Sequence, residues 1–255
     1  MTPIRRPAAA LALLLATSSL APLSRPAVAQ AADTRPPATN LAWWHPLAAA
    51  GGVGALFLID VPVRDWIQDR PGSTKDDIAD FAKDFKDPKV FAVSSVGTVA
   101  LGLILREPKV TTTGLHIAAA YGLAGGLNYV TKWAFGRTRP SGTPDDQLNF
   151  NWFEGDENSA FPSGSAAVVF SLATTLSDAV DRTPVTILLY SGATVNAWAR
   201  MYSDRHWLSD VALGALIGVT SAKLVNGEWT VFGLRPPAIW TDGRSMSMAW
   251  TVPTR

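Results

Sequence analysis

Residues 200–225 read RMYSDRHWLSDVALGALIGVTSAKLV, a polar segment that continues into an apolar one of helical length. In the apolar part, from about 207, polar and apolar residues do not alternate as they would in a half-buried strand, so the pattern favours a helix. Similar segments lie at roughly 45–59, 90–105, 112–134, 164–179 and 184–201. The sequence therefore predicts an all-α fold, a compact bundle of about six core helices.

A more polar helix is expected between the first two of these segments. Ser73 or Thr74 can cap its N-terminus, and Ile78, Phe81 and Phe85 recur at helical spacing. We expect these three apolar side chains to share one face of the helix.

The whole chain divides by composition into four parts. Residues 1–29 are a predicted signal peptide, 30–40 a linker rich in Ala, Thr and Pro, 41–226 the helical domain, and 227–255 a tail. In the tail, Asp242-Gly243 lies between two short runs, and this dipeptide is a strong signal for a hairpin turn. A small C-terminal β-hairpin is therefore predicted.

The N-terminal part has the order of features that marks a secretory signal peptide. Arg5 and Arg6 precede an apolar run at 8–15, and the small residues Ala27-Val28-Ala29 follow. The run is too short to be a first transmembrane helix. We expect cleavage after Ala29 and an exported protein, periplasmic or otherwise extracytoplasmic.

Composition excludes several classes of protein. The chain has 255 residues, a net charge of +1 and no cysteine. Because Lys and Arg form no basic stripe, nucleic-acid binding is not expected. The lack of cysteine excludes disulfide frameworks, zinc-thiolate sites and thiol nucleophiles. No cluster of metal ligands is present in the sequence, so no metal or other cofactor is predicted.

The apolar segments leave the question of a membrane open. A membrane-spanning helix needs about 20 apolar residues, whereas the uncharged stretches 90–105 and 211–222 have 16 and 12 residues. Trp43, Trp44 and Trp133, near helix ends, suit either a membrane interface or a protein core. The lengths favour a compact domain with buried helices, and membrane association is the alternative.

Three segments interrupt the apolar pattern with residues that carry chemistry: KWAFGRTRP at 132–140, FPSGS at 161–165 and RMYSDRHWLSD at 200–210. In the first, Lys132 offers a point charge and Arg139 a planar fork, both suited to phosphate oxygens. In the second, Ser163-Gly164 has the pattern of a helix N-terminus, where backbone N–H groups attract anions.

The third segment combines a histidine with a carboxylate. His206 and Asp210 are four residues apart and share one helical face. A carboxylate so placed can hold one imidazole nitrogen and leave the other as a nucleophile, and Arg200 can face the same anion. Alone, each segment is typical of a structural feature, but together they predict one site for a phosphoryl-like group.

The order K-x6-R-P, P-S-G, R-x5-H-x3-D resembles the type 2 phosphatidic acid phosphatase superfamily, PAP2. That superfamily also holds bacterial acid phosphatases and vanadium haloperoxidases. The resemblance is strongest over 132–210, and it implies an active site at helix ends that needs no metal. It also implies that His206 attacks phosphorus to give a phosphohistidine and that Asp210 orients His206. The implied phosphate-binding set is Lys132, Arg139, Arg200, Ser163 and the backbone N–H of Gly164.

Ser165 departs from the family pattern, because P-S-G is normally followed by a histidine that protonates the leaving group. A hydroxyl is far too weak an acid for that role, and loss of a general acid costs about 10²–10⁴ in rate. Glu154, Asp156 or Glu157 would serve if its pKa were raised. Three outcomes follow: a slow enzyme, an enzyme for substrates with good leaving groups, or a protein that binds phosphate without turnover.

The sequence thus predicts a metal-independent phosphatase acting on a phosphomonoester or diphosphate with a lipid or small-molecule tail. One alternative is a catalytically attenuated phosphate- or lipid-phosphate-binding protein. The other is a vanadate-dependent haloperoxidase, which the serine at 165 also disfavours.

Overall fold

The computed structural model describes residues 38–232, 238–241 and 246–249. The predicted signal peptide lies outside these residues, as do most of the predicted linker and the Asp242-Gly243 turn. The cleavage site and the export of the chain therefore stay predictions.

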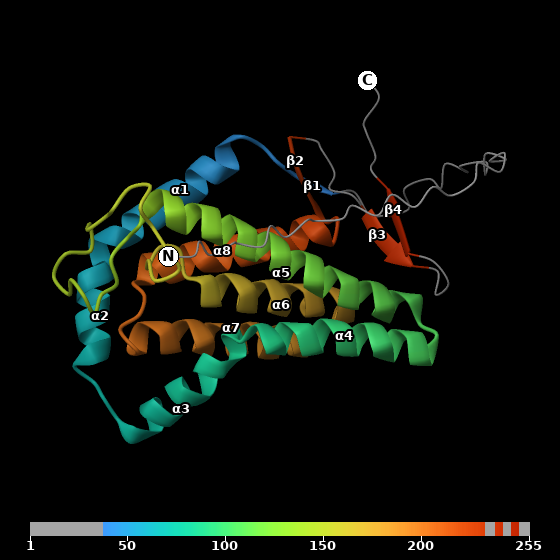
Figure 1. Ribbon diagram of the computed structural model, residues 1–255, viewed down its shortest axis with the longest axis horizontal. Helices are drawn as coiled ribbons and strands as arrows, with labels where there is room; N and C mark the ends of the chain where they lie inside the picture. The colour runs from blue at the N-terminus through green and yellow to red at the C-terminus, as the bar shows by residue number, and fades with distance from the viewer. Residues whose placement is uncertain (1–37, 233–237, 242–245, 250–255) are drawn as a thin grey trace, which may run out of the picture. The chain divides into compact units, whose positions relative to one another are not determined.

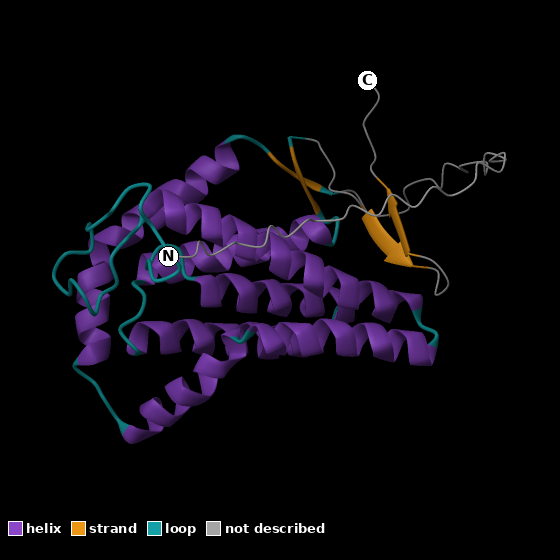
Figure 2. Ribbon diagram, in the orientation of Figure 1, coloured by secondary structure: helices purple, strands orange, loops and turns teal. Residues whose placement is uncertain are grey.

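The six predicted core helices are present, and the all-α prediction is confirmed. They are α1 (Trp44–Leu56), α4 (Pro88–Leu105), α5 (Pro108–Phe135), α6 (Gly164–Val180), α7 (Thr183–Tyr202) and α8 (Leu208–Val225) (Figures 1 and 2). Proline stands in the first turn of α4, α5 and α7, where its fixed φ suits a helix start and its missing N–H costs nothing.

Helix α6 is the centre of the bundle and packs against α5, α7 and α8. Most of its residues are buried, and the buried ones are all Ala, Ser, Thr or Val. Val168, Val169 and Ala173 join Phe91 of α4 and Ala193 of α7 in one core cluster. A helix that is buried all round needs such small side chains, because neighbouring helices approach it closely.

Two glycines of α8 allow its closest approach to α6. A Cβ atom at Gly214 would lie 2.3 Å from the carbonyl oxygen of Ser163, and one at Gly218 would lie 2.2 Å from that of Ala167. Only hydrogen fits at these distances. The contact sets α8 against the first turn of α6, and the first turns of both helices carry predicted site residues.

Helix α3 (Ser73–Lys83) differs from its prediction in two respects. Its N-cap is Gly72, without a side-chain hydrogen bond, so neither Ser73 nor Thr74 is the cap. The expected apolar side chains do not supply the buried face, which consists of Ala79 and Ala82 against Ala199 of α7. Small side chains form the contact because α3 and α7 approach each other closely. The larger apolar residues Ile78, Phe81 and Phe85 are exposed.

The remaining elements connect or flank the bundle. The short η1 (Phe57–Ile59) joins α1 to α2 (Asp60–Gln68), and η2 (Asp84–Lys86) joins α3 to α4. Strand β1 (Thr39–Leu41) includes the last two residues of the predicted linker and pairs in parallel with β2 (Trp229–Val231). Strands β3 (Ala238–Thr241) and β4 (Met246–Ala249) pair antiparallel, so the predicted C-terminal hairpin is confirmed.

The expectation of buried helices is wrong for the outer part of the bundle. Three described helical stretches are long and apolar enough to cross a membrane: 44–68, 88–105 and 208–225. In the first two, only 11% of the most apolar window is buried inside the protein. The sequence-based estimate ended each stretch at a charged residue, whereas α8 continues past Asp210 and Lys223 and α4 begins at Pro88, before Lys89.

Candidate active site

The predicted site residues lie at one end of the bundle. Figure 1 shows the end of α5, the starts of α6 and α8 and the end of α7 on the same side. Gly136 ends α5 with a left-handed φ of 54°, and a Cβ atom there would lie 2.0 Å from the carbonyl oxygen of Asn151. This turn at Gly136 sends the following loop, 137–163, back across the helix ends.

The His206 side chain is buried, and one of its ring nitrogens is held by the main chain. Nδ1 lies 2.8 Å from the carbonyl oxygen of Ala160. Because a carbonyl oxygen can only accept, Nδ1 carries the proton in this contact and Nε2 keeps its lone pair. Nε2 is therefore the ring nitrogen that is able to act as a nucleophile.

Asp210 is close to His206 but forms no hydrogen bond with it. Its Oδ2 atom lies 3.6 Å from Nδ1 and instead accepts the backbone N–H of Trp207 at 2.7 Å. The sequence predicts that Asp210 orients the imidazole of His206. In the structure, the hydrogen-bond partner of Nδ1 is the Ala160 carbonyl, and Asp210 lies beside the ring without a hydrogen bond to it. The Ala160 carbonyl fixes the tautomer, while Asp210 adds negative charge beside it.

Three predicted cations surround the histidine. Lys132 and Arg200 are buried, and both lie near enough to His206 to lower its pKa by charge repulsion. Arg139 in turn interacts electrostatically with Lys132 and Arg200. The structure therefore brings together His206 and all three cations from 132, 139 and 200.

Some N–H donors of these cations have no acceptor in the described part of the protein. The Nε atoms of Arg139 and Arg200 are buried and have no hydrogen-bond partner among the described residues. Within the same residues, none of Lys132, Arg139 and Arg200 forms an ion pair with a carboxylate. Lys132 donates to the carbonyl oxygen of Ser159. Buried guanidinium donors without partners are costly unless an anion binds them.

The P-S-G segment forms the predicted helix N-terminus. Ser163 is the N-cap of α6 and accepts a hydrogen bond from the backbone of Ala166 at 3.4 Å. Its own backbone N–H donates to the carbonyl oxygen of Asp210 at 2.9 Å. Gly164 is the first helical residue, and its N–H belongs to the group that has no partner inside a helix. The arrangement suits an anion beside the start of α6.

Ser165 lies in the buried first turn of α6, and neither remaining histidine can replace it. His45 stacks on Trp44 at the start of α1, at the far end of that helix from Asp60 and the site. His116 lines a separate cavity together with Thr175, which is ten residues along α6 from Ser165. Ten helical residues span about 15 Å.

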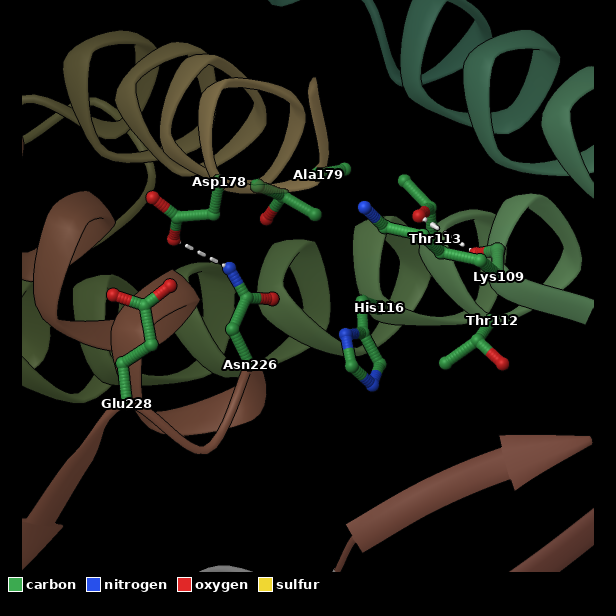
Figure 3. Close-up of a pocket in the computed structure, with 9 residues that line it drawn as sticks. Lys109, Thr112, Thr113, His116, Asp178, Ala179, Asn226 and Glu228 are labelled. Atoms are coloured by element: carbon green, nitrogen blue, oxygen red, sulfur yellow. Dashed lines mark hydrogen bonds between the residues drawn. The ribbon is translucent and has the colours of Figure 1, made fainter. Parts of the chain in front are cut away.

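That separate cavity has a volume of about 270 Å³ and a different character. Figure 3 shows Asp178 hydrogen-bonded to Asn226, with Glu228 on the same side and Lys109 across the cavity. Asp178 and Glu228 both accept hydrogen bonds from Lys223, at 2.7 and 2.6 Å. Its two carboxylates therefore share one lysine, and the cavity combines acidic and basic side chains, unlike the cluster of cations around His206.

The acidic loop before P-S-G does not supply an evident acid. Hydrogen bonds from the backbone and side chain of Asn158 hold the pKa of Asp156 below its usual range, with further bonds from Ser159. A general acid needs the opposite shift. Glu154 and Glu157 are exposed to solvent.

The sequence analysis missed the buried residues that contact Asp210 and its neighbour Ser209. Arg137 is fully buried and contacts both Asp60 and Asp210. A signal existed for Arg137, which lies within the first motif between Lys132 and Arg139. None existed for Asp60, because 149 residues separate it from its partner Ser209.

A buried histidine among unpaired cations at the ends of a helical bundle has the chemistry to hold a phosphoryl group. Residues 113–227 match the family model described as the PAP2 superfamily. This region contains every predicted anion-binding residue, and over it the chain is similar to the PAP2 superfamily.

Similar proteins are phosphatases. A lipid A 1-phosphatase of Porphyromonas gingivalis is 32% identical over 114 residues, which are 44% of this chain and 22% of that protein. The chain thus matches less than a quarter of the length of that curated relative.

Two solved structures share the fold. LpxE of Aquifex aeolicus has a TM-score of 0.51 at 23% identity, covering 64% of this chain and 92% of its own. The transmembrane PAP2-type phosphatidylglycerolphosphate phosphatase of Bacillus subtilis has a TM-score of 0.54 at 19% identity, covering 72% and 95%.

Proposed function

We propose that this chain is a membrane-associated lipid phosphatase that releases phosphate through a phosphohistidine formed on His206. The observation that carries the proposal is the pairing of a held imidazole with unpaired cations. Nδ1 is bound by the Ala160 carbonyl, and the buried Nε atoms of Arg139 and Arg200 have no partner among the described residues. Such a site combines a nucleophile with charges that neutralise a phosphoryl group.

In the proposed reaction, Nε2 of His206 attacks phosphorus, and the bond from phosphorus to the leaving oxygen breaks. The ring then carries phosphate on Nε2 and a proton on Nδ1, so it is positively charged. The Ala160 carbonyl and the nearby Asp210 carboxylate stabilise that charge. Water then attacks phosphorus, which frees Nε2 and releases inorganic phosphate. Lys132, Arg139 and Arg200 neutralise the phosphoryl oxygens in both steps.

A lipid tail on the substrate is supported by the surface around the bundle. The apolar stretches 44–68 and 88–105 are largely unburied inside the protein, and large apolar side chains such as Leu58 and Ile104 are exposed. Exposed apolar surface of this extent marks a membrane or ligand contact. The named substrates of the similar phosphatases are lipids too.

The attenuated phosphate-binding protein remains the second candidate because of Ser165. Neither His45 nor His116 lies at the site to take over the role of an acid, and the pKa of Asp156 is shifted in the wrong direction for an acid. A site that lacks a general acid still binds phosphate through its cations.

A substrate panel distinguishes the two candidates. The full chain in detergent micelles is supplied with a lipid phosphomonoester, a lipid diphosphate, an aryl phosphate and a short alkyl phosphate, and released phosphate is measured. We expect release from the lipid diphosphate and the aryl phosphate, because their leaving groups need little protonation. Tight binding of inorganic phosphate without release from any substrate would instead support the attenuated binding protein.

The burial of His206 predicts activity at unusually low pH. Desolvation lowers the pKa of His206 to about 4, repulsion from Lys132 and Arg200 acts in the same direction, and Asp210 opposes it. The nucleophile must be neutral, and a lowered pKa keeps it neutral down to that value. We expect kcat/KM for an aryl phosphate to fall only as the pH drops through about 4. A fall centred near 6.5, the ordinary histidine value, would contradict this assignment.

A further inference from the structure

Behind the candidate nucleophile lies a buried arginine whose hydrogen bonds are complete. Arg137 donates through Nη1 to Asp210 Oδ1 at 2.6 Å and to Ser209 Oγ at 2.7 Å. It donates through Nη2 to Asp60 Oδ2 at 2.7 Å and to the Gln147 carbonyl at 2.5 Å, and through Nε to the same carbonyl at 2.9 Å. All five of its N–H groups therefore have acceptors.

Aromatic rings close the space around this guanidinium. Its central carbon lies 4.4 Å from the ring centre of Phe57, 5.2 Å from that of Trp207 and 5.6 Å from that of Phe150. These rings exclude water and favour a cation over their faces. Arg137 is thus fixed in one orientation, with one edge toward Asp210.

Asp60 reaches this cluster from α2, outside the region that matches the family model. Its Oδ1 accepts the backbone N–H of Ser209 at 2.9 Å, and its Oδ2 accepts the Ser209 hydroxyl at 2.5 Å. Ser209 directly precedes Asp210 in the first turn of α8. Asp60 therefore holds the turn that carries Asp210 as well as the arginine that binds Asp210.

The charges of the cluster give Asp60 a second effect. Asp60, Arg137 and Asp210 are all fully buried, and the two carboxylates share one guanidinium. With Asp60 present, Arg137 neutralises Asp210 only in part, and negative charge remains beside Nδ1 of His206. Without the Asp60 charge, Arg137 would neutralise Asp210 alone. In a buried site, such a change is screened less than it would be in water.

We propose that Asp60 and Arg137 are positioning residues that set the orientation and the effective charge of Asp210 beside His206. This inference rests on the proposed function, since it concerns the stabilisation of the charged phosphohistidine. It predicts that loss of the Asp60 charge weakens a complex in which an oxyanion is bonded to the His206 imidazole, as in the transition state. The binding of free phosphate, which forms no such bond, should stay intact.

The test compares two oxyanions on the full chain in detergent micelles. The affinity for inorganic phosphate measures what the cations contribute to binding. Vanadate also accepts a bond from an imidazole nitrogen and then resembles the five-coordinate transition state. Asp60→Asn keeps the shape of the side chain and removes its charge. Asp178→Asn is the matched control, because it removes a carboxylate from another ion pair, that with Lys223 in the separate cavity.

We expect Asp60→Asn to weaken vanadate binding and kcat by roughly 10- to 100-fold, the range seen when a group behind a catalytic ligand is removed. Its phosphate affinity and KM should stay within about threefold of wild type. Asp60→Glu restores the charge and should recover part of the loss. Asp178→Asn should change none of these quantities. Circular dichroism and thermal unfolding establish that each variant is folded.

Equal weakening of phosphate and vanadate, or no change in either, would overturn the inference, because a purely structural ion pair behaves in that way. If Asp60→Asn fails to fold, Arg137→Lys carries the same comparison, with the same expected split between the two oxyanions. Failure of the proposed function has a different signature: wild-type protein that binds phosphate but neither binds vanadate more tightly nor releases phosphate. That outcome would also end this inference, independently of any variant.

Discussion

Replacing His206 by alanine should abolish phosphate release from every substrate, with a loss of about 10⁴-fold or more, as for other covalent nucleophiles. The remaining cations still bind phosphate, but no other described side chain offers a held imidazole at the site. The rate of phosphate release from an aryl phosphate measures the effect. His116→Ala is the matched control, since His116 lines the separate cavity, and this variant should retain wild-type activity.

Asp210→Asn provides a graded comparison for the same assignment. Asparagine keeps the shape of the side chain but removes the charge 3.6 Å from Nδ1, while the Ala160 carbonyl still holds the ring. We expect a reduced but measurable rate. Substantial phosphate release by His206→Ala protein would refute the phosphohistidine, whatever the result for Asp210→Asn.

The helices could be predicted because each has the length and composition of a helix on its own. Local sequence also located the site, since its residues fall in three short motifs at helix ends. Burial was harder to foresee. The six apolar segments look alike in sequence, yet α6 is surrounded by three helices, whereas α4 has only 11% of its most apolar window buried. Which helix becomes central depends on contacts between distant segments.

The network behind Asp210 shows the same limit at the level of single residues. Asp60 is one of many acidic residues in the sequence, and nothing nearby distinguishes it. Its role arises only when α2 meets the start of α8, 149 residues later in the chain. The contact of His206 with the Ala160 carbonyl was equally hidden, because it involves a main-chain atom that every residue possesses.

The position of Ser165 leads to the second large effect, a steep dependence of the wild-type rate on the leaving group. Without a general acid, the leaving oxygen departs as an anion. An alkoxide is then costly, whereas an aryl oxide or a phosphate is far better stabilised. We therefore expect rates for diphosphates and aryl phosphates to exceed those for alkyl phosphates by a wide margin, measured as kcat across leaving groups of graded pKa.

Histidine at 165 should flatten this dependence. Ser165 lies in the first turn of α6, two residues after Ser163, so an imidazole there starts from the helix end at which we propose that the phosphoryl group binds. In the Ser165→His variant, turnover of alkyl phosphates should rise by about 10²-fold, the usual effect of a general acid. Ser165→Asn is the matched control, because asparagine has a similar size and cannot protonate an alkoxide.

The two substitutions separate acid catalysis from a change in pocket shape. If Ser165→His and Ser165→Asn alter the alkyl rate equally, the imidazole is not acting as an acid, and the pocket no longer presents a leaving oxygen to position 165. Equal rates for alkyl and aryl phosphates in the wild type would show that another acid already acts. The exposed carboxylates Glu154 and Glu157 would then be the first to replace, because the lowered pKa of Asp156 keeps that carboxyl group ionised and without a proton to donate at neutral pH.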